Sequence, residues 1–173
     1  MTTNIEPIFE LKDIVPLLVE CNLPVADISP SQSPQFFGVR SESGLVAVVG
    51  LELFGAVALL RSLAVSPAHR GRGLASQLVA YAESVAACRG VDSLFLLTTT
   101  ASDFFSKLGF VSASRSAAPP AIQATSQFSS LCPASSAFLR KPIAGPTLRS
   151  SGTRQKRRAL QLERLIAKHT RRI

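Results

Sequence analysis

Cysteine is scarce in this sequence and follows no pattern. The 173 residues include three cysteines, Cys21, Cys88 and Cys132, an odd number at wide spacing. This set matches neither a disulfide framework nor a Cys-x-x-Cys metal site, so we expect no bound metal and a reducing, cytoplasmic setting. The first residues also lack the basic and apolar regions of a secretory signal peptide.

Long apolar runs and internal repeats are missing as well. The stretch from Leu45 to Leu60 is apolar except for Glu52, but it is too short to cross a membrane comfortably and contains two glycines. We interpret it as two buried strands with a turn at Phe54–Gly55 and expect no membrane span. The absence of a repeat period excludes a solenoid, and eleven prolines and ten glycines exclude an all-helical chain.

Acidic residues are nearly absent from the C-terminal end. Residues 1–148 carry ten basic and ten acidic side chains, whereas residues 149–173 carry nine Lys or Arg against Glu163 alone, which accounts for the net charge of +8. We predict one mixed α/β domain over residues 1–141, then a linker and a basic helical tail over residues 142–173. The tail either binds nucleic acid, an acidic membrane or a partner groove, or is a solvated extension.

Hydrophobic periodicity predicts the order of the elements. Asp13 is expected to cap a helix running from Ile14 toward Cys21. Further helices are predicted over Gly73–Arg89 and Ala101–Leu108. Strands are predicted over Ile5–Glu10, Gln35–Arg40, Leu45–Leu53, Ala56–Val65, Ser93–Thr98, Phe110–Ala113 and Ala137–Lys141.

The most informative segment lies between Leu63 and Leu78, where a strand end, a glycine turn and a helix start follow one another. Unpaired amides converge at the positive end of a helix dipole there, which suits a pyrophosphate. Gly71 and Gly73 let the backbone approach the anion, and neighbouring arginines add charge. The alternative is a plain helix start with solvated arginines. A Walker loop is absent, and the dinucleotide fingerprint lacks its third glycine.

Two motifs in this region carry a family resemblance. Arg70-Gly71-Arg72-Gly73-Leu74-Ala75, preceded by Leu63-Ala64-Val65-Ser66-Pro67, resembles the cofactor loop of the GNAT superfamily of acetyl-CoA-dependent N-acetyltransferases. Ala101-x-x-Phe104-Phe105-x-x-Leu108-Gly109-Phe110 resembles the helix and strand that follow that loop in the family. The resemblance covers about residues 5–141 and omits the tail.

This resemblance implies the fold, the cofactor and the cofactor contacts. The expected fold is of α+β type, a mixed, mostly antiparallel sheet of six to seven strands flanked by about four helices. Acetyl-CoA would be the acetyl donor and a small amine the acceptor, in a monomer or homodimer. The implied cofactor-binding residues are Leu63, Ala64, Val65, Arg70, Gly71, Arg72, Gly73, Leu74, Ala75 and Phe104.

A narrower resemblance concerns the acceptor. Leu59–Val65 together with Ser130–Ser135 is similar to small acetyltransferases associated with bacterial arsenic-resistance operons. It implies an amino-acid-like acceptor, whose carboxylate or oxyanion Arg61 would hold. The loops that would form the acceptor side, around Asp27–Phe37 and Ser114–Ser136, carry no motif.

The catalytic residues are less clearly marked. Glu52, the sole charge in its apolar run, is the best candidate for a general base, and an ion pair with Arg61 is the alternative. Many family members use a tyrosine as proton donor, but the matching position here is Phe105. Ser106 is the nearest substitute, although an exposed helix serine is the plainer interpretation. A member that binds acyl-CoA without turnover, or a nucleic-acid-binding protein acting through its tail, remain alternatives to an enzyme.

Overall fold

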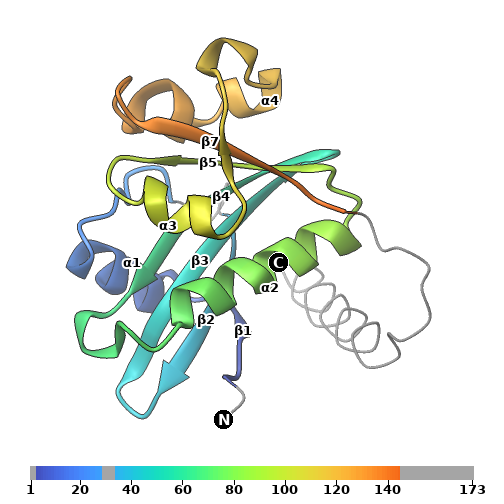
Figure 1. Ribbon diagram of the computed structural model, residues 1–173. Helices are drawn as coiled ribbons and strands as arrows, with labels where there is room; N and C mark the ends of the chain where they lie inside the picture. Colours follow the sequence, from blue (N-terminus) through green and yellow to red (C-terminus); the bar gives the residue numbers. More distant parts are fainter. Residues whose placement is uncertain (1–2, 29–33, 145–173) are drawn as a thin grey trace, which may run out of the picture.

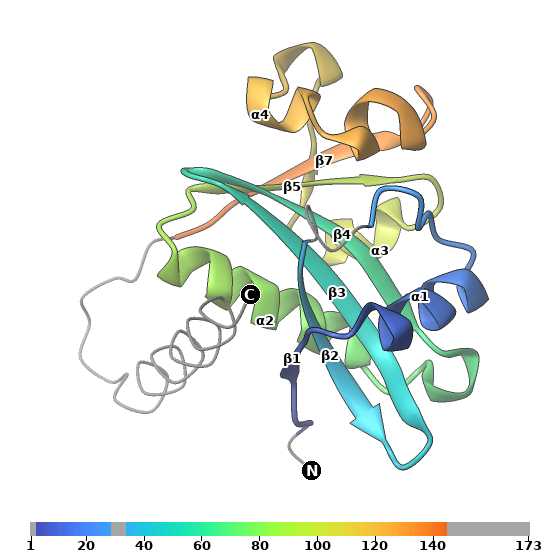
Figure 2. The ribbon, with the colours of Figure 1, turned by 180° about the vertical axis from the view of Figure 1, so that it is seen from behind.

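A seven-stranded sheet organises the chain, with helices on both of its faces (Figures 1 and 2). The computed structural model describes residues 3–28 and 34–144. The basic tail predicted over residues 149–173 lies outside the described residues. The strands are β1 (Glu6–Ile8), β2 (Gln35–Ser41), β3 (Gly44–Phe54), β4 (Val57–Val65), β5 (Ser93–Thr98), β6 (Val111–Ser112) and β7 (Ala137–Pro142).

The strand order is β1-β2-β3-β4-β5-β7-β6. Neighbouring strands are antiparallel except for β4 and β5, which are parallel. A parallel pair needs a crossover, and α2 (Leu74–Cys88) lies in the connection between these two strands. The mixed, mostly antiparallel sheet expected from the sequence is confirmed.

Apolar side chains form a core on each face of the sheet. On one face α2 and α3 (Ser102–Lys107) cover the largest core cluster, with Leu78, Val79, Ala82 and Ala86 of α2 fully buried. Their spacing of three and four residues places them along one side of the helix. The opposite face is covered by α1 (Leu11–Glu20) and α4 (Pro120–Gln123), each with its own cluster.

The start of the first helix differs from the prediction. The helix begins at Leu11 with Glu10 in the capping position, and no side chain caps it. Asp13 lies in the first turn, where its carboxylate accepts a hydrogen bond of 2.6 Å from Arg40 on β2. The predicted cap was wrong because a cation within reach holds this carboxylate instead of the helix amides.

The Ser-, Ala- and Pro-rich segment before β7 contains short helical turns. These are η2 (Arg115–Ala117), α4 and the π-helical turn η3 (Gln127–Leu131). They stand above the end of the sheet where β5 and β7 lie (Figure 1). None of the helices within residues 3–28 and 34–144 has the length and hydropathy of a membrane span.

Candidate active site

Strands β4 and β5 run side by side for only a short distance and then diverge (Figure 1). Their pairing extends from Val57–Ser93 to Leu59–Phe95. Beyond that point β4 continues along β3, and β5 continues along β7. Past Leu59, the backbone N–H and C=O groups of β4 on the side away from β3 face an opening instead of a neighbouring strand. The carbonyl of Val65 accepts hydrogen bonds from Arg70 and Cys21.

An irregularity in β4 accompanies this divergence. Between the pairs Val48–Ala64 and Gly50–Arg61, β4 has one residue more than β3. The bulge is at Ser62, whose φ of 52° lies in the left-handed region. A bulge bends its strand and redirects nearby side chains. Here it turns the second half of β4 away from β5, at the place where the opening begins.

The loop after β4 presents amide groups at the start of α2. Gly71 and Gly73 have φ values of 73° and 74°, which favour glycine. No side chain caps α2, and the amide of Gln77 bonds back to the carbonyl of Gly73 at 3.1 Å. The earlier amides of the first turn have no intrahelical acceptor. This end of the helix is therefore suited to an anion.

The opening and the loop join in one cleft of about 810 Å³. Nine of the ten residues that the sequence assigns to cofactor binding line this cleft; the exception is Arg72. Arg72 is exposed, and its guanidinium donates a 3.4 Å hydrogen bond to the carbonyl of Ala68. The structure thus brings together the predicted strand, loop and Phe104, but it does not place Arg72 on the wall of the cleft.

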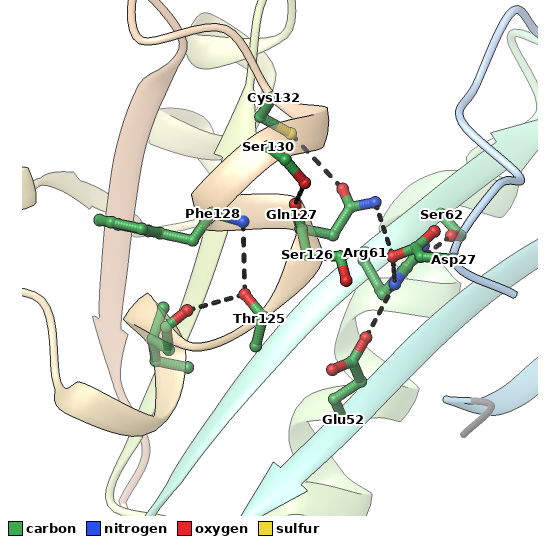
Figure 3. A network of polar contacts seen from close by, with 11 residues as sticks. Asp27, Glu52, Arg61, Ser62, Thr125, Ser126, Gln127, Phe128, Ser130 and Cys132 are labelled. Atoms are coloured by element: carbon green, nitrogen blue, oxygen red, sulfur yellow. Dashed lines mark hydrogen bonds and ion pairs between the residues drawn. The ribbon is translucent and has the colours of Figure 1, made fainter. Parts of the chain in front are cut away.

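A buried ionic network lies beside the cleft (Figure 3). The Arg61 side chain is 4% exposed and binds both carboxylate oxygens of Asp27 through Nη1 and Nη2, the latter at 2.6 Å. Nη1 also donates to Oε1 of Glu52 at 2.8 Å, and Nε donates to Ser62 Oγ at 3.3 Å. The ion pair weighed for Glu52 and Arg61 is present, and a second carboxylate joins it.

This network shifts two pKa values. Burial alone would raise the pKa of the Asp27 carboxyl, but the hydrogen bonds and charge of Arg61 outweigh it and hold the pKa below its ordinary 3.8. Burial would likewise lower the pKa of Arg61, but the carboxylates of Asp27 and Glu52 raise it instead. Asp27 and Arg61 are therefore both charged at neutral pH.

The region expected to supply a proton donor contains no tyrosine. Phe105 is buried between Phe104 and Phe110, with ring centroids 5.1 and 5.6 Å away. Ser106 is exposed on α3 and is not among the residues that line the cleft. The structure therefore does not bring Ser106 to the other candidate residues.

Two residues near the cleft, Asp27 and Gln127, were missed by sequence reasoning about single sites, and they connect Arg61 to Cys132. Asp27 holds Arg61, Gln127 Nε2 donates to Asp27 Oδ2 at 3.3 Å, and Cys132 Sγ donates to Gln127 Oε1 at 3.4 Å. Burial raises the pKa of the Cys132 thiol, and the charges of Arg115 and Arg61 offset this only in part. These residues lie in loops without a motif, so only the fold reveals that they meet.

Comparisons with known proteins agree with this geometry. The sequence model of the acetyltransferase (GNAT) domain matches residues 32–112. No curated protein sequence matches the chain. Among solved structures, N-acetylglutamate synthase from Neisseria gonorrhoeae, complexed with coenzyme A and N-acetyl-glutamate, superimposes with a TM-score of 0.68 at 19% identity. That match covers 83% of this chain and 36% of the synthase chain, so the chain spans little more than a third of that relative.

Two smaller acetyltransferases match over almost their full length. One is an acetyltransferase of the GNAT family from Staphylococcus aureus, with a TM-score of 0.63, 17% identity, and coverage of 83% of this chain and 100% of that one. The other is the ribosomal-protein-S18-alanine N-acetyltransferase from Escherichia coli, with a TM-score of 0.58, 18% identity, and coverage of 86% and 99%. The segment matched by the family model contains β2 through α3 and is a little under half of the chain. The solved structures show that the chain has the fold of these acetyltransferases.

Proposed function

We propose that the chain is an N-acetyltransferase that transfers the acetyl group of acetyl-CoA to a small amine by direct attack. The observation that carries this proposal is the single cleft that joins the N-terminus of α2 to the opening between β4 and β5. One end suits a diphosphate, and the other offers unpaired strand edges to an extended arm. A ligand of this shape with an anionic head fits coenzyme A.

The residues available in the cleft fit such a cofactor. We assign the diphosphate to the amides from Gly71 to Ala75, with Arg70 beside them on the cleft wall. A Cβ added at Gly71 would meet nothing within 4 Å, so the loop surface is open at this point. The pantetheine arm would lie along Leu63 to Val65. When bound, acetyl-CoA supplies an acetyl thioester whose leaving group is a thiolate.

In this proposal Glu52 takes the proton of the acceptor. An acceptor that arrives as an ammonium first loses one proton to Glu52, which frees the lone pair of the nitrogen. The nitrogen then forms a bond to the acetyl carbon as the carbon–sulfur bond breaks, and it releases a second proton to water. The Glu52 side chain is 22% exposed, and its Oε1 is held by Arg61. Backbone N–H groups on the unpaired edge of β4 would stabilise the negative charge on the carbonyl oxygen.

The leaving thiolate requires a proton as well. Cys132 lines the cleft, and the burial that raises the pKa of its thiol keeps the proton on sulfur at neutral pH. We assign it as the candidate donor, because Ser106 lies outside the cleft and Phe105 has no proton to give. Water is the alternative source.

The amino-acid-like acceptor and the arsenic connection remain sequence-based predictions. They depend on an Arg61 guanidinium that is free to hold a carboxylate or oxyanion. In the described structure, this guanidinium already binds Asp27, Glu52 and Ser62. An amino acid bearing an arsenic oxyanion nevertheless belongs in the acceptor panel, because acetylation of it would establish the connection directly.

Release of free thiol from acetyl-CoA, measured across a panel of amines, tests the enzymatic proposal. We expect acceptor-dependent release and a product heavier by one acetyl group in mass spectrometry. The buried Phe105 favours one rival, a protein that binds acyl-CoA without turnover. Cofactor binding without thiol release for any amine would support that rival and reject the proposed reaction.

A further inference from the structure

A second pocket lies on the other side of Arg61 from the cofactor cleft. It has a volume of about 510 Å³, within the usual range for small-molecule sites. Its walls come from the loop after α1, the start of β2, the end of β3, and α4 with the residues after it. Described residues from both segments that lack a motif thus meet here, namely Asp27, Pro34 and Gln35 from the first and Ala121, Ala124, Thr125 and Ser126 from the second. Arg61 lines both this pocket and the cleft.

Arg61 has little capacity left to bind an anion in this pocket, because four of its five N–H donors are already used. It is the only cation among the described residues that line it. Its Nη1 donates to Asp27 and Glu52, its Nη2 donates to Asp27, and its Nε donates to Ser62. With the guanidinium occupied by two carboxylates, a carboxylate on the ligand would meet net negative charge in a partly buried site.

Two hydrogen-bond acceptors in the pocket wall have no partner. Oε1 of Glu52 accepts from Arg61, whereas Oε2 has no partner within the described part of the chain. The amide oxygen of Gln35, another lining residue, is buried and accepts no hydrogen bond from residues 3–28 or 34–144. The buried oxygen of Gln35 is costly without a donor, and the partly exposed Oε2 of Glu52 can accept a second hydrogen bond, so a ligand that donates hydrogen bonds is favoured here.

The rest of the wall is apolar. It includes side chains from β3 and α4, namely Leu51, Leu53, Phe54, Ala121 and Ala124. Apolar side chains beside a few polar acceptors complement a ligand with an ammonium group at one end and a hydrocarbon body at the other.

We propose that this pocket binds the acetyl acceptor as a primary ammonium with an apolar body and no carboxylate. The ammonium donates to Glu52 and Gln35, and the body packs against β3 and α4. The inference rests on the proposed function in one respect, because it identifies the ligand as the acetyl acceptor. The charge preference of the pocket concerns binding alone and does not depend on catalysis. The sequence predicted an amino-acid-like acceptor held by Arg61, and this proposal replaces it with an amine that lacks a carboxylate.

The matched probes are 2-phenylethylamine and phenylalanine, which differ only by a carboxylate, with phenylalanine amide as a control for added bulk. Calorimetry of the full chain saturated with coenzyme A gives their affinities. We expect 2-phenylethylamine to bind at least about tenfold more tightly than phenylalanine, and the amide to lie closer to 2-phenylethylamine. Glu52→Gln should weaken 2-phenylethylamine about tenfold, the loss expected for a charge-assisted hydrogen bond.

Glu42→Gln is the matched control variant, because Glu42 is exposed at the turn between β2 and β3. It removes the same charge from the protein and should leave amine affinity unchanged. Equal or tighter binding of phenylalanine overturns the proposal, and so does the absence of amine binding or an unchanged affinity in Glu52→Gln. If Glu52→Gln fails to fold, the comparison of the two probes on the unaltered chain decides.

Thiol release separates this inference from the proposed function. Tight binding of 2-phenylethylamine without thiol release from acetyl-CoA supports the pocket's charge preference and rejects the reaction. Thiol release that is faster with phenylalanine than with 2-phenylethylamine supports the reaction and overturns the inference.

Discussion

Arg61 is the residue on which the polar interior depends most. Its guanidinium is almost fully buried, so the cost of removing it from water must be offset by its partners. Asp27 supplies two hydrogen bonds and Glu52 one. Loss of Asp27 leaves a buried cation with a single carboxylate, whereas loss of an exposed partner elsewhere changes little.

Asp27→Asn should therefore destabilise the fold by about 3 kcal/mol at neutral pH, near the lower end for a broken buried pair because Glu52 remains. Asp13→Asn is the control: its pair with Arg40 is partly exposed and should be worth less than about 1 kcal/mol. Denaturant unfolding of both variants measures the difference. Equal losses would contradict the structural role given to Asp27.

The pH dependence of this loss has a defined direction. Because the folded pKa of Asp27 is lowered, its stabilisation is fully present above the unfolded value of 3.8 and disappears as the pH falls through the folded value. The difference in unfolding free energy between the unaltered chain and Asp27→Asn should therefore disappear as the pH falls below the folded pKa of Asp27. A difference in unfolding free energy that stays constant down to the pH of acid unfolding would refute the stabilising role of the Asp27 carboxylate.

The reactivities of Cys132 and Cys88 can be compared within one chain to test whether cofactor occupies the cleft. Cys132 lines the cleft and has a thiol pKa raised by burial, whereas Cys88 is exposed at the end of α2. We expect iodoacetamide to modify Cys88 faster at pH 7–8, since the thiolate is the reactive form. Coenzyme A should slow modification of Cys132 and leave Cys88 unaffected, as measured by peptide mass spectrometry. Protection of neither cysteine would argue against cofactor next to η3.

At the scale of elements, the loop between β4 and α2 is the proposed anion site. Gly73 adopts a left-handed φ immediately before the helix, and a Cβ there would meet only the Gln77 side chain at 3.7 Å. Gly55, in the turn between β3 and β4, has a similar φ of 66° and open space around it. The two glycines therefore share a backbone requirement but differ in location.

Gly73→Ala and Gly55→Ala should each lower stability by about 1–2 kcal/mol through backbone strain. Only Gly73→Ala should weaken coenzyme A, because it disturbs the amides of the loop. Thermal unfolding and calorimetric titration of both variants provide the two readouts. Equal effects on coenzyme A affinity would show that the loop has no special part in binding.

The same elements show which parts of the structure could be predicted from the sequence alone. The strand, glycine turn and helix around Gly71 have a local pattern, so their conformation and place on the cleft follow from nearby residues. Asp27 and Gln127 are one hundred residues apart and hydrogen bond only because the chain folds two loops together. Asp13 was misassigned as a cap because the position of Arg40 on β2 depends on the sheet. Long-range charge partners therefore escaped prediction, whereas local backbone motifs did not.

For the molecule as a whole, the proposed cofactor cleft and the second pocket are neighbours that share Arg61. The cofactor cleft opens where β4 and β5 part, and the second pocket lies among β3, α4 and the loop after α1. Arg61 lines both of them, and its acidic partners Asp27 and Glu52 line the second pocket. Donor and acceptor would thus approach a common point from different directions, which is the geometry that direct transfer requires.

Cofactor binding should also stabilise the whole domain. Coenzyme A at about one hundred times its dissociation constant should add about 2.7 kcal/mol to the free energy of unfolding, provided that only the folded state binds. Thermal unfolding with increasing coenzyme A measures this as a rising midpoint. Adenosine without the diphosphate is the control and should produce a much smaller shift, because the loop amides would have no anion to bind.

Calorimetric titration of the folded chain with coenzyme A tests the central claim most directly. The account predicts saturable binding with one site per chain, weakened in Gly73→Ala and retained in Gly55→Ala. A chain that is folded by circular dichroism but neither releases nor absorbs heat with coenzyme A, and shows no binding by a second method such as ligand-detected NMR, would contradict it.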